Sequence, residues 1–288
     1  MGMGFPFVWA NGQILSREEF DRSFGAVRSA SLGVFETFLW TRGGVKRFER
    51  HLARLQRGVL ALGGAPFSWS VAETLAALLR RNGVAEAVCR FEVQREGSFA
   101  FLRPRPGPPS GQVSVCIAST PLGDPGLTGN HKTNRRESYD RALGEAREQG
   151  DFEALLLNRE GSVCEGSRSS LFVATENGVV TPGLECGVVA GVVREWVLGL
   201  PQAPSCVRAL APEELFGARE VILTNAVRGV LGVSGLRHGD RWRTGLPGFE
   251  GPVARAWAER WNRLPLSTPP GRLEVSSNPG LGVPPEPA

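Results

Sequence analysis

Hydrophobic residues recur along the chain with two different spacings, which predict a mixture of helices and strands. Between residues 47 and 62, leucine and valine recur three or four positions apart and Gly63 follows, so we predict an amphipathic helix that ends there. The same spacing predicts helices over residues 71–81, 139–149 and 247–264. Short apolar or alternating runs predict strands over residues 8–14, 33–40, 88–95, 113–117, 154–157, 163–173 and 221–226.

The order of these elements predicts two domains. Residues 1–120 form a smaller α+β half, and residues 121–130 contain three glycines and two prolines, which is typical of a linker. Residues 131–264 form a larger half, and residues 265–288 are rich in Pro, Gly and Ser, so we predict a disordered or loosely packed tail. With 288 residues, of which 41% are hydrophobic, each half can bury its own core. We therefore expect a two-domain fold of mixed α and β class, with a ligand in the cleft between the domains.

Composition and charge exclude several classes of protein. The net charge is +4, but the arginines are interleaved with acidic residues, which favours a solvated surface over nucleic-acid binding. No apolar run has membrane-spanning length, and residues 1–7 lack the features of a secretory signal, so we expect a soluble, cytoplasmic protein. The five cysteines are dispersed without metal-ligand spacing, so we expect reduced thiols and no metal site.

Lysine is the first candidate for covalent chemistry. The chain has 33 basic residues besides histidine, and only Lys46 and Lys132 are lysines. Arginine stays protonated, whereas a lysine amine can lose its proton and attack a carbonyl to form a Schiff base. From the count alone, survival of one lysine on a solvated face is an equally good explanation, so the sequence around Lys132 has to decide.

The segments that follow Lys132 resemble those of the fold-type IV pyridoxal-phosphate enzymes, the group that holds branched-chain and D-amino-acid aminotransferases and aminodeoxychorismate lyases. Lys132-Thr133 matches the K-T segment whose lysine forms the Schiff base, and Glu165-Gly166-Ser167 begins a match to E-G-S-x-S-N-[IL]-F. The resemblance implies that Glu165 contacts the pyridine nitrogen of pyridoxal 5'-phosphate, where a carboxylate keeps the ring cationic and electron-accepting. Ser170 replaces the usual asparagine of this motif.

The resemblance also implies residues that hold the cofactor phosphate. His51-Leu52-Ala53-Arg54-Leu55 resembles H-x-x-R-L, whose arginine binds the phosphate; for Arg54 the alternative is an exposed helix charge, and His51 is interpreted as structural. Gly191 opens a predicted helix, and its match to G-[IV]-L-x-G-[IV]-[TV]-R implies that Gly191, Val192 and Val193 offer backbone N–H groups to the phosphate. Thr224 and Asn225 lie in the turn that the family uses as a second phosphate clamp.

Motifs on the substrate side match less closely. Thr37 belongs to a G-V-F-E-T segment that runs beside the active site in the family, whereas residues 21–30 match the family pattern only loosely. Arg90, on a predicted strand, points at the ligand or pairs within its own sheet. Arg95 and Arg228 are the other candidates for binding substrate carboxylates, and residues 224–230, T-N-A-V-R-G-V, resemble aminodeoxychorismate lyases most.

The predicted function is a pyridoxal-phosphate-dependent lyase that converts 4-amino-4-deoxychorismate to 4-aminobenzoate and pyruvate. The alternative in the same family is an aminotransferase acting on D-amino acids or branched-chain amino acids, because the cofactor residues are shared. A second alternative is a non-enzymatic scaffold, which the intact Lys132 and Glu165 disfavour. By resemblance we also expect a homodimer.

Overall fold

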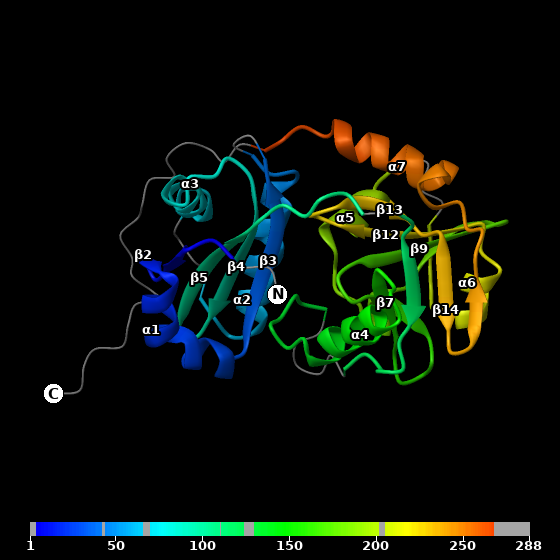
Figure 1. Cartoon of the computed structure of the whole chain (residues 1–288), viewed down its shortest axis with the longest axis horizontal. Helices are drawn as coiled ribbons and strands as arrows, with labels where there is room; N and C mark the ends of the chain where they lie inside the picture. Colours follow the sequence, from blue (N-terminus) through cyan, green and yellow to red (C-terminus); the bar gives the residue numbers. More distant parts are fainter. Residues whose placement is uncertain are drawn as a thin grey trace. The chain divides into compact units, whose positions relative to one another are not determined.

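The computed structural model describes residues 4–41, 44–65, 70–109, 111–123, 130–201 and 205–267. The chain forms two compact units. Unit 1 comprises residues 1–106, 131–135 and 265–288, and unit 2 comprises residues 107–130 and 136–264. The mixture of helices and strands in both units (Figure 1) confirms the predicted mixed α and β class.

Unit 1 is built on one antiparallel sheet. Its strand order is β2 (Gln13–Ser16), β1 (Phe7–Ala10), β5 (Gly97–Arg103), β4 (Ala87–Gln94) and β3 (Gly33–Trp40). The β1–β2 hairpin turns at Asn11 and Gly12, both of which have positive φ angles, as the Asn-Gly pair predicts. β3 lies at one end of this order, where the segment that carries Lys132 joins it through the bridge between Val34 and Thr133.

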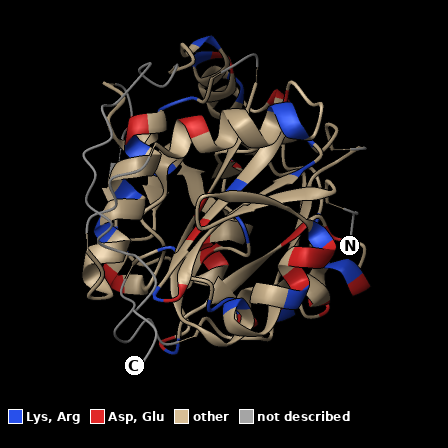
Figure 2. Cartoon of the chain, turned by 90° about the vertical axis from the view of Figure 1, so that its left-hand side faces the viewer, with Lys and Arg blue, Asp and Glu red and all other residues tan. Residues whose placement is uncertain are grey.

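The helices of unit 1 are α1 (Arg17–Ala30), α2 (Phe48–Ala61) and α3 (Val71–Arg81). α1 begins with a capping box between Ser16 and Glu19, and its Phe20 ring packs edge-on against Phe99 and Phe101 of β5. α2 buries one face, as its leucine and valine spacing predicts. Figure 2 shows basic and acidic positions interspersed over the helices, in agreement with the interleaved charges of the sequence.

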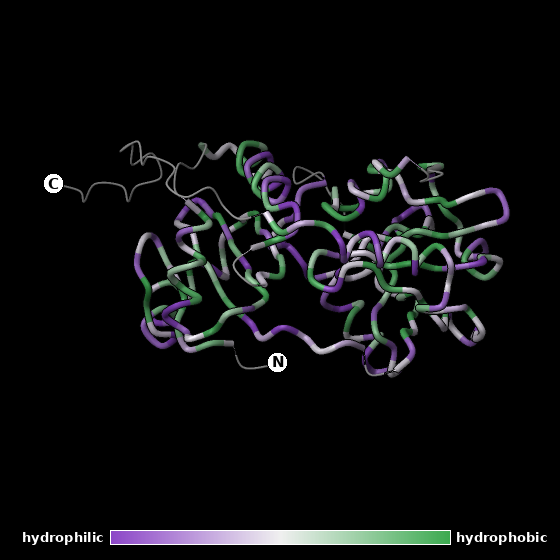
Figure 3. Tube along the Cα trace, turned by 90° about the horizontal axis from the view of Figure 1, so that it is seen from above, coloured by the Kyte–Doolittle hydropathy of each residue, from purple (hydrophilic) through white to green (hydrophobic). Residues whose placement is uncertain are grey.

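Unit 2 contains two sheets that share a core. One has the strand order β11 (Ser205–Val207), β10 (Gly178–Thr181), β9 (Ser170–Thr175), β12 (Glu220–Asn225) and β13 (Gly229–Gly232). The other has the order β15 (Arg241–Arg243), β14 (Gly235–His238), β6 (Ser114–Ile117), β7 (Glu153–Leu157) and β8 (Val163–Gly166). Leu155 of β7 and Leu171 of β9 lie in the same buried cluster, which also contains Leu223 of β12. Hydrophobic and hydrophilic stretches alternate along the trace of the chain (Figure 3).

The helices of unit 2 cover these sheets. They are α4 (Glu137–Glu148), α5 (Val192–Leu198), α6 (Pro212–Phe216) and α7 (Pro252–Arg263), with short 3-10 turns at Leu184–Cys186 and Gly248–Glu250. α4 packs its Ala142 and Ala146 against β7. α5 and α7 meet through Trp196 and Trp261, whose ring centroids are 5.2 Å apart. Both rings lie in the same buried cluster as Phe172 of β9. Among the described residues, no helix has the length and apolar character needed to cross a membrane.

Most predicted elements form, and several details differ. The predicted strand 163–173 is two strands, because bends at residues 167–169 separate β8 from β9. Residues 97–103, over which no strand was predicted, form strand β5, and the last helix begins at Pro252. Helix α1 was not predicted.

The division into units also departs from the predicted domains. β6 pairs in parallel with β7 and β14 and so belongs to unit 2, whereas residues 131–135 join unit 1. The predicted tail from residue 268 onward and residues 124–129 of the predicted linker lie outside the described residues.

Candidate active site

The backbone around Lys132 is fixed against strand β3 in unit 1. The Phe35 N–H donates to the Lys132 carbonyl at 2.9 Å, and the Asn134 N–H donates to the Gly33 carbonyl at 3.0 Å. The Asn134 side chain adds two bonds, since its Oδ1 accepts from the Gly33 N–H and its Nδ2 donates to the Ser31 carbonyl. The segment therefore continues the sheet edge, which gives the lysine a defined starting direction.

The Lys132 amine lies beside an aromatic ring that it shares with an arginine. Its Nζ is 4.7 Å from the centroid of the Phe35 ring, and Cζ of Arg90 is 3.6 Å from the same centroid. Arg90 is directly opposite Thr37 in the β3–β4 register, and directly opposite residues share a face of the sheet. Three predicted residues, Lys132, Thr37 and Arg90, are thus brought together within unit 1.

A buried carboxylate holds Arg90 together with Arg28, a residue that we did not predict. Glu92, with only 2% of its side chain exposed, accepts from Arg28 Nε at 2.6 Å and Nη2 at 2.7 Å, and also from Arg90 Nε. Burial alone would raise the pKa of Glu92, but the two guanidinium groups lower it below its ordinary value. We predicted that Arg90 either points at the ligand or pairs within its own sheet. The structure shows the second alternative, the ion pair between Arg90 and Glu92. Arg28 still exposes 31% of its side chain, and Arg90 exposes 16%.

Arg54 lies in a second buried ion pair. Its Nε and Nη2 contact the two carboxylate oxygens of Glu36 at 2.6 and 2.8 Å, and His51 Nδ1 lies 2.7 Å from Glu36 Oε2. Burial opposes ionisation of Glu36, but Arg54 and then His51 outweigh it and lower its pKa to about 2. Burial lowers the pKa of His51, and the nearby Arg54 and Lys132 charges lower it further against the effect of Glu36. The exposed alternative for Arg54 is wrong, since only 7% of the residue is exposed; its contact with phosphate stays a prediction.

Glu165 in unit 2 is buried, and two uncharged groups donate hydrogen bonds to one of its oxygens. Tyr139 Oη donates to Glu165 Oε1 at 2.7 Å, and the Val189 N–H donates to the same oxygen at 3.0 Å. Burial and the neighbouring carboxylate raise the pKa of Tyr139 far above its usual range, so the phenol keeps its proton. Arg194 interacts electrostatically with Glu165, but its Nη2 donates to the Pro182 carbonyl. The carboxylate is thus oriented by Tyr139 and by the segment that leads to Gly191.

Two of the predicted phosphate residues of unit 2, Gly191 and Thr224, lie next to Ser170. A Cβ at Gly191 would lie 2.5 Å from Ser170 Oγ, so glycine is needed for this close approach. Ser170 is directly opposite Thr224 in the β9–β12 register. In the described part of the chain, the buried Thr224 hydroxyl has no hydrogen-bond partner, and no side chain caps the start of α5. An unsatisfied buried hydroxyl beside the first N–H groups of a helix fits a phosphate, and the anionic Glu165 fits a protonated ring nitrogen.

The side chains of Asn225 and Arg228 are used within unit 2. Asn225 Oδ1 accepts from the Val227 and Arg228 N–H groups, and its Nδ2 donates to Ser169 Oγ at 3.0 Å. Arg228 Nη1 donates to the Gly107 carbonyl at 2.8 Å. Arg95 lies exposed in the turn between β4 and β5 of unit 1. A cofactor contact of Asn225, and substrate contacts of Arg95 and Arg228, stay predictions.

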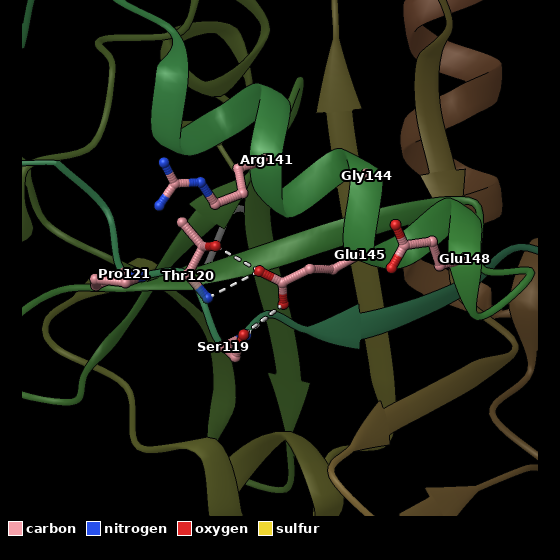
Figure 4. A pocket seen from close by; sticks show the side chains of 7 residues that line it. All are labelled: Ser119, Thr120, Pro121, Arg141, Gly144, Glu145 and Glu148. Carbon is pink, nitrogen blue, oxygen red and sulfur yellow. Dashed lines mark hydrogen bonds between the residues drawn. The ribbon is translucent and has the colours of Figure 1, made fainter.

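A surface pocket of about 650 Å³ on unit 2 contains none of the predicted residues (Figure 4). Glu145 of α4 points into it and accepts hydrogen bonds from the backbone and hydroxyl groups of Ser119 and Thr120. Because these donors already bind both of its oxygens, we interpret Glu145 as a cap for the end of β6. In the described residues, no cluster of His, Cys, Asp or Glu side chains is arranged to hold a metal ion.

The comparisons with known proteins agree with the class that the fold and these residues define, the pyridoxal-phosphate-dependent enzymes of fold type IV. The chain belongs to the amino-transferase class IV family, whose model matches residues 33–236. Its cofactor is accordingly pyridoxal 5'-phosphate. The joint action of the Lys132 group in unit 1 and the Glu165 group in unit 2 stays a prediction, as do the homodimer and the cytoplasmic location.

Relatives within the family carry different activities. A probable branched-chain-amino-acid aminotransferase of Thermotoga maritima is 38% identical over 85 residues, which are 28% of this chain and 31% of that protein. An aminodeoxychorismate lyase of Vibrio harveyi is 35% identical over 130 residues, 43% of this chain and 46% of that protein. These matches span less than half of either relative. The structure of a branched-chain aminotransferase from Thermoproteus uzoniensis superposes with a TM-score of 0.75 at 22% identity, over 90% of this chain and 94% of that one.

Proposed function

We propose that this chain is a lyase that converts 4-amino-4-deoxychorismate to 4-aminobenzoate and pyruvate, with Lys132 and Glu165 as its catalytic residues. The observation that carries the choice of substrate is the pair of guanidinium groups, Arg28 and Arg90, that share the Glu92 carboxylate. In this cluster two positive charges meet one negative charge beside the Phe35 ring that Lys132 also contacts. Such a site suits an anionic group of the substrate and disfavours an aliphatic side chain.

Pyridoxal phosphate, when bound, supplies a carbonyl carbon that condenses with amines and a ring that accepts electrons. Arg54, the start of α5 and the Thr224 hydroxyl would hold its phosphate, and Glu165 would meet its ring nitrogen. Lys132 would supply the amine that condenses with the cofactor carbonyl, and its Nζ would serve as the base for the proton on the ring carbon that carries the substrate amine.

In the lyase reaction, the electron pair left at that carbon forms a ring double bond and breaks the neighbouring carbon–oxygen bond. Enolpyruvate leaves, takes up a proton and becomes pyruvate, while the ring becomes aromatic. Atoms and electrons balance without a further reactant. The aminodeoxychorismate lyase relative and the T-N-A-V-R-G-V segment support this reaction over transamination.

An aminotransferase is the second candidate, and the match to a branched-chain aminotransferase at 38% identity favours it. In that reaction Lys132 would act first as base and then as acid, and hydrolysis would release a keto acid. To separate the two, the enzyme receives aminodeoxychorismate made in situ from chorismate and, in parallel, L- and D-amino acids with 2-oxoglutarate or pyruvate. We expect 4-aminobenzoate to form well above any rate of transamination. Steady transamination of a D- or branched-chain amino acid without formation of 4-aminobenzoate would show that the protein is an aminotransferase and would contradict the lyase proposal.

The role of the arginine pair has its own test. Arg28→Gln removes two charge-assisted bonds at Glu92 and a positive charge near the substrate; charged hydrogen bonds are worth about 1.5–3 kcal/mol, so we expect kcat/KM for aminodeoxychorismate to fall about 10- to 100-fold. Arg22→Gln on the same helix is the matched control, because Arg22 is exposed and pairs with Glu18 only at the surface. Equal activity of the Arg28→Gln and Arg22→Gln variants would show that the pair of Arg28 and Arg90 does not bind the substrate.

A further inference from the structure

Tyr139 of helix α4 is in direct contact with Glu165. It is the one tyrosine in the sequence. Its ring packs against the cluster that holds Ala142 and Ala146, and its hydroxyl donates to Glu165 Oε1 at 2.7 Å. The Arg136 guanidinium lies 4.7 Å from the centroid of the Tyr139 ring and donates to the Ser167 carbonyl, which fixes the ring from its outer side.

The contact favours the anionic form of Glu165. A hydrogen bond to the charged form of a carboxylate stabilises that form, and a phenol that keeps its proton is a permanent donor. The Val189 N–H donates to the same oxygen, so two donors from different segments set the orientation of the carboxylate. Hydrogen bonds to a carboxylate make it a weaker base. When a ring nitrogen donates an N–H···O hydrogen bond to such a carboxylate, the proton stays on the nitrogen.

We propose that Tyr139 is a positioning residue that keeps Glu165 anionic and thereby keeps the proton of the bound cofactor on its ring nitrogen. This inference rests on the proposed role of Glu165 at that nitrogen. A protonated ring withdraws electrons more strongly, so Tyr139 contributes to proton loss at the substrate carbon without touching the substrate. The same bond makes Tyr139 a reporter, because a single tyrosine gives a single spectroscopic signal.

The first test uses the protein without added cofactor, labelled with carbon-13 at Cζ of tyrosine. The single resonance should stay at the phenol position up to about pH 10.5, where a free tyrosine with a pKa near 10 is mostly ionised. In Glu165→Gln the resonance should shift at neutral pH, because the acceptor has lost its charge. Glu145→Gln removes another carboxylate from the same helix and should leave the resonance unchanged. An identical resonance in wild type and Glu165→Gln would overturn the proposal.

The second test compares Tyr139→Phe with wild type, both loaded with nitrogen-15-labelled pyridoxal phosphate. Phenylalanine keeps the ring packing and removes only the hydroxyl. We expect the ring-nitrogen resonance to move towards that of a neutral pyridine, and kcat to fall about tenfold or more with little change in KM, as for the loss of one hydrogen bond to a charged group. An unchanged nitrogen resonance with unchanged kcat would reduce Tyr139 to a packing residue.

The two proposals fail in different ways. A protein that takes up no pyridoxal phosphate but shows the Glu165-dependent tyrosine signal would contradict the proposed function and leave the Tyr139–Glu165 bond standing. A protein that binds the cofactor and forms 4-aminobenzoate, but whose tyrosine resonance is the same in wild type and Glu165→Gln, would contradict only the role of Tyr139.

Discussion

Buried carboxylates have different partners in the two units. In unit 1, Glu36 and Glu92 are both bound by guanidinium groups. In unit 2, the bonds described for Glu153, Glu165 and Glu220 come from backbone N–H and hydroxyl groups. The pKa values follow this difference: that of Glu36 is lowered to about 2, whereas burial raises the pKa of Glu153 above its ordinary value. Asp151 of unit 2, which pairs with Arg237, departs from the pattern.

The difference separates two uses of a buried negative charge. A carboxylate that is bound by guanidinium groups has its charge neutralised locally, so it fixes the positions of arginines. A carboxylate that is bound by uncharged donors keeps its net charge, which a cationic ligand can then meet. Glu36 and Glu92 therefore organise the surroundings of Lys132, whereas the described hydrogen bonds of Glu165 orient its carboxylate without neutralising it. Four changes test this contrast.

The largest effect is expected for Lys132→Arg. Arginine keeps the charge but cannot form the covalent bond to the cofactor, so turnover and the visible absorbance of the loaded enzyme should both be abolished. Lys46→Arg, at the other lysine of the chain, is the matched control and should behave as wild type. Wild-type turnover by the Lys132 variant would show that another group carries the chemistry.

Glu165→Gln should leave the fold intact and slow the reaction. A neutral amide stabilises a cationic ring less, and we expect proton loss at the substrate carbon to slow by about 10²–10⁴-fold, the range for losing a group that assists proton transfer. Circular dichroism and cofactor uptake check the fold, and single-turnover kinetics measure the step. Rates near wild type with an unchanged spectrum would mean that the charge of Glu165 has no catalytic use.

Glu36→Gln should lower the free energy of unfolding. It leaves the Arg54 guanidinium buried without its counter-charge, a change that costs about 3–5 kcal/mol. The matched change in unit 2, Glu153→Gln, removes a carboxylate whose described hydrogen bonds come from the Arg168 N–H and the Ser169 hydroxyl, and it should cost no more than about 1–2 kcal/mol. Denaturant unfolding measures both, and equal losses in the two variants would contradict the contrast between the units.

A smaller effect is expected from the pH dependence of stability. The folded-state pKa of His51 is lowered, so its contribution is present above about pH 6.5 and is lost as the pH falls from there towards the folded-state value. The slope should reach at most about 1.4 kcal/mol per pH unit. His51→Asn should flatten the pH dependence of the unfolding free energy between about pH 6.5 and 5. A profile that is unchanged by His51→Asn would contradict a neutral buried imidazole.

Local patterns predicted what depends on near neighbours in sequence. The spacing in residues 47–62 predicted α2 to within one residue at each end, and the Asn11-Gly12 pair predicted its hairpin. Helix α1 was not predicted, because only Phe20 of its fourteen residues is buried and its apolar spacing is weak. The signal that could have found it is Ser16 followed three residues later by Glu19.

Pairings between residues that are far apart along the chain could not be predicted from the sequence. A helix arginine next to a histidine gives no indication that its partner is Glu36 on β3, and Arg28 has no motif that connects it to Glu92, 64 positions away. Lys132 and Glu165 were identified because their motifs are local. Tyr139 was placed on the helix by its spacing, but its hydroxyl partner depends on how α4 packs against β7 and β8.

The bonds between the Lys132 segment and β3 tie the folding of unit 1 to that of the whole chain. Gly33 and Asn134 are 101 positions apart in sequence, and the intervening chain includes residues 107–130 of unit 2. Unit 1 is therefore not a continuous stretch, and during synthesis its β3 edge has to wait for the Lys132 segment to emerge. Until then the edge offers unpaired N–H and C=O groups to other strands. A fragment that ends at residue 106 would keep that open edge permanently, so we expect it to aggregate where the full chain does not.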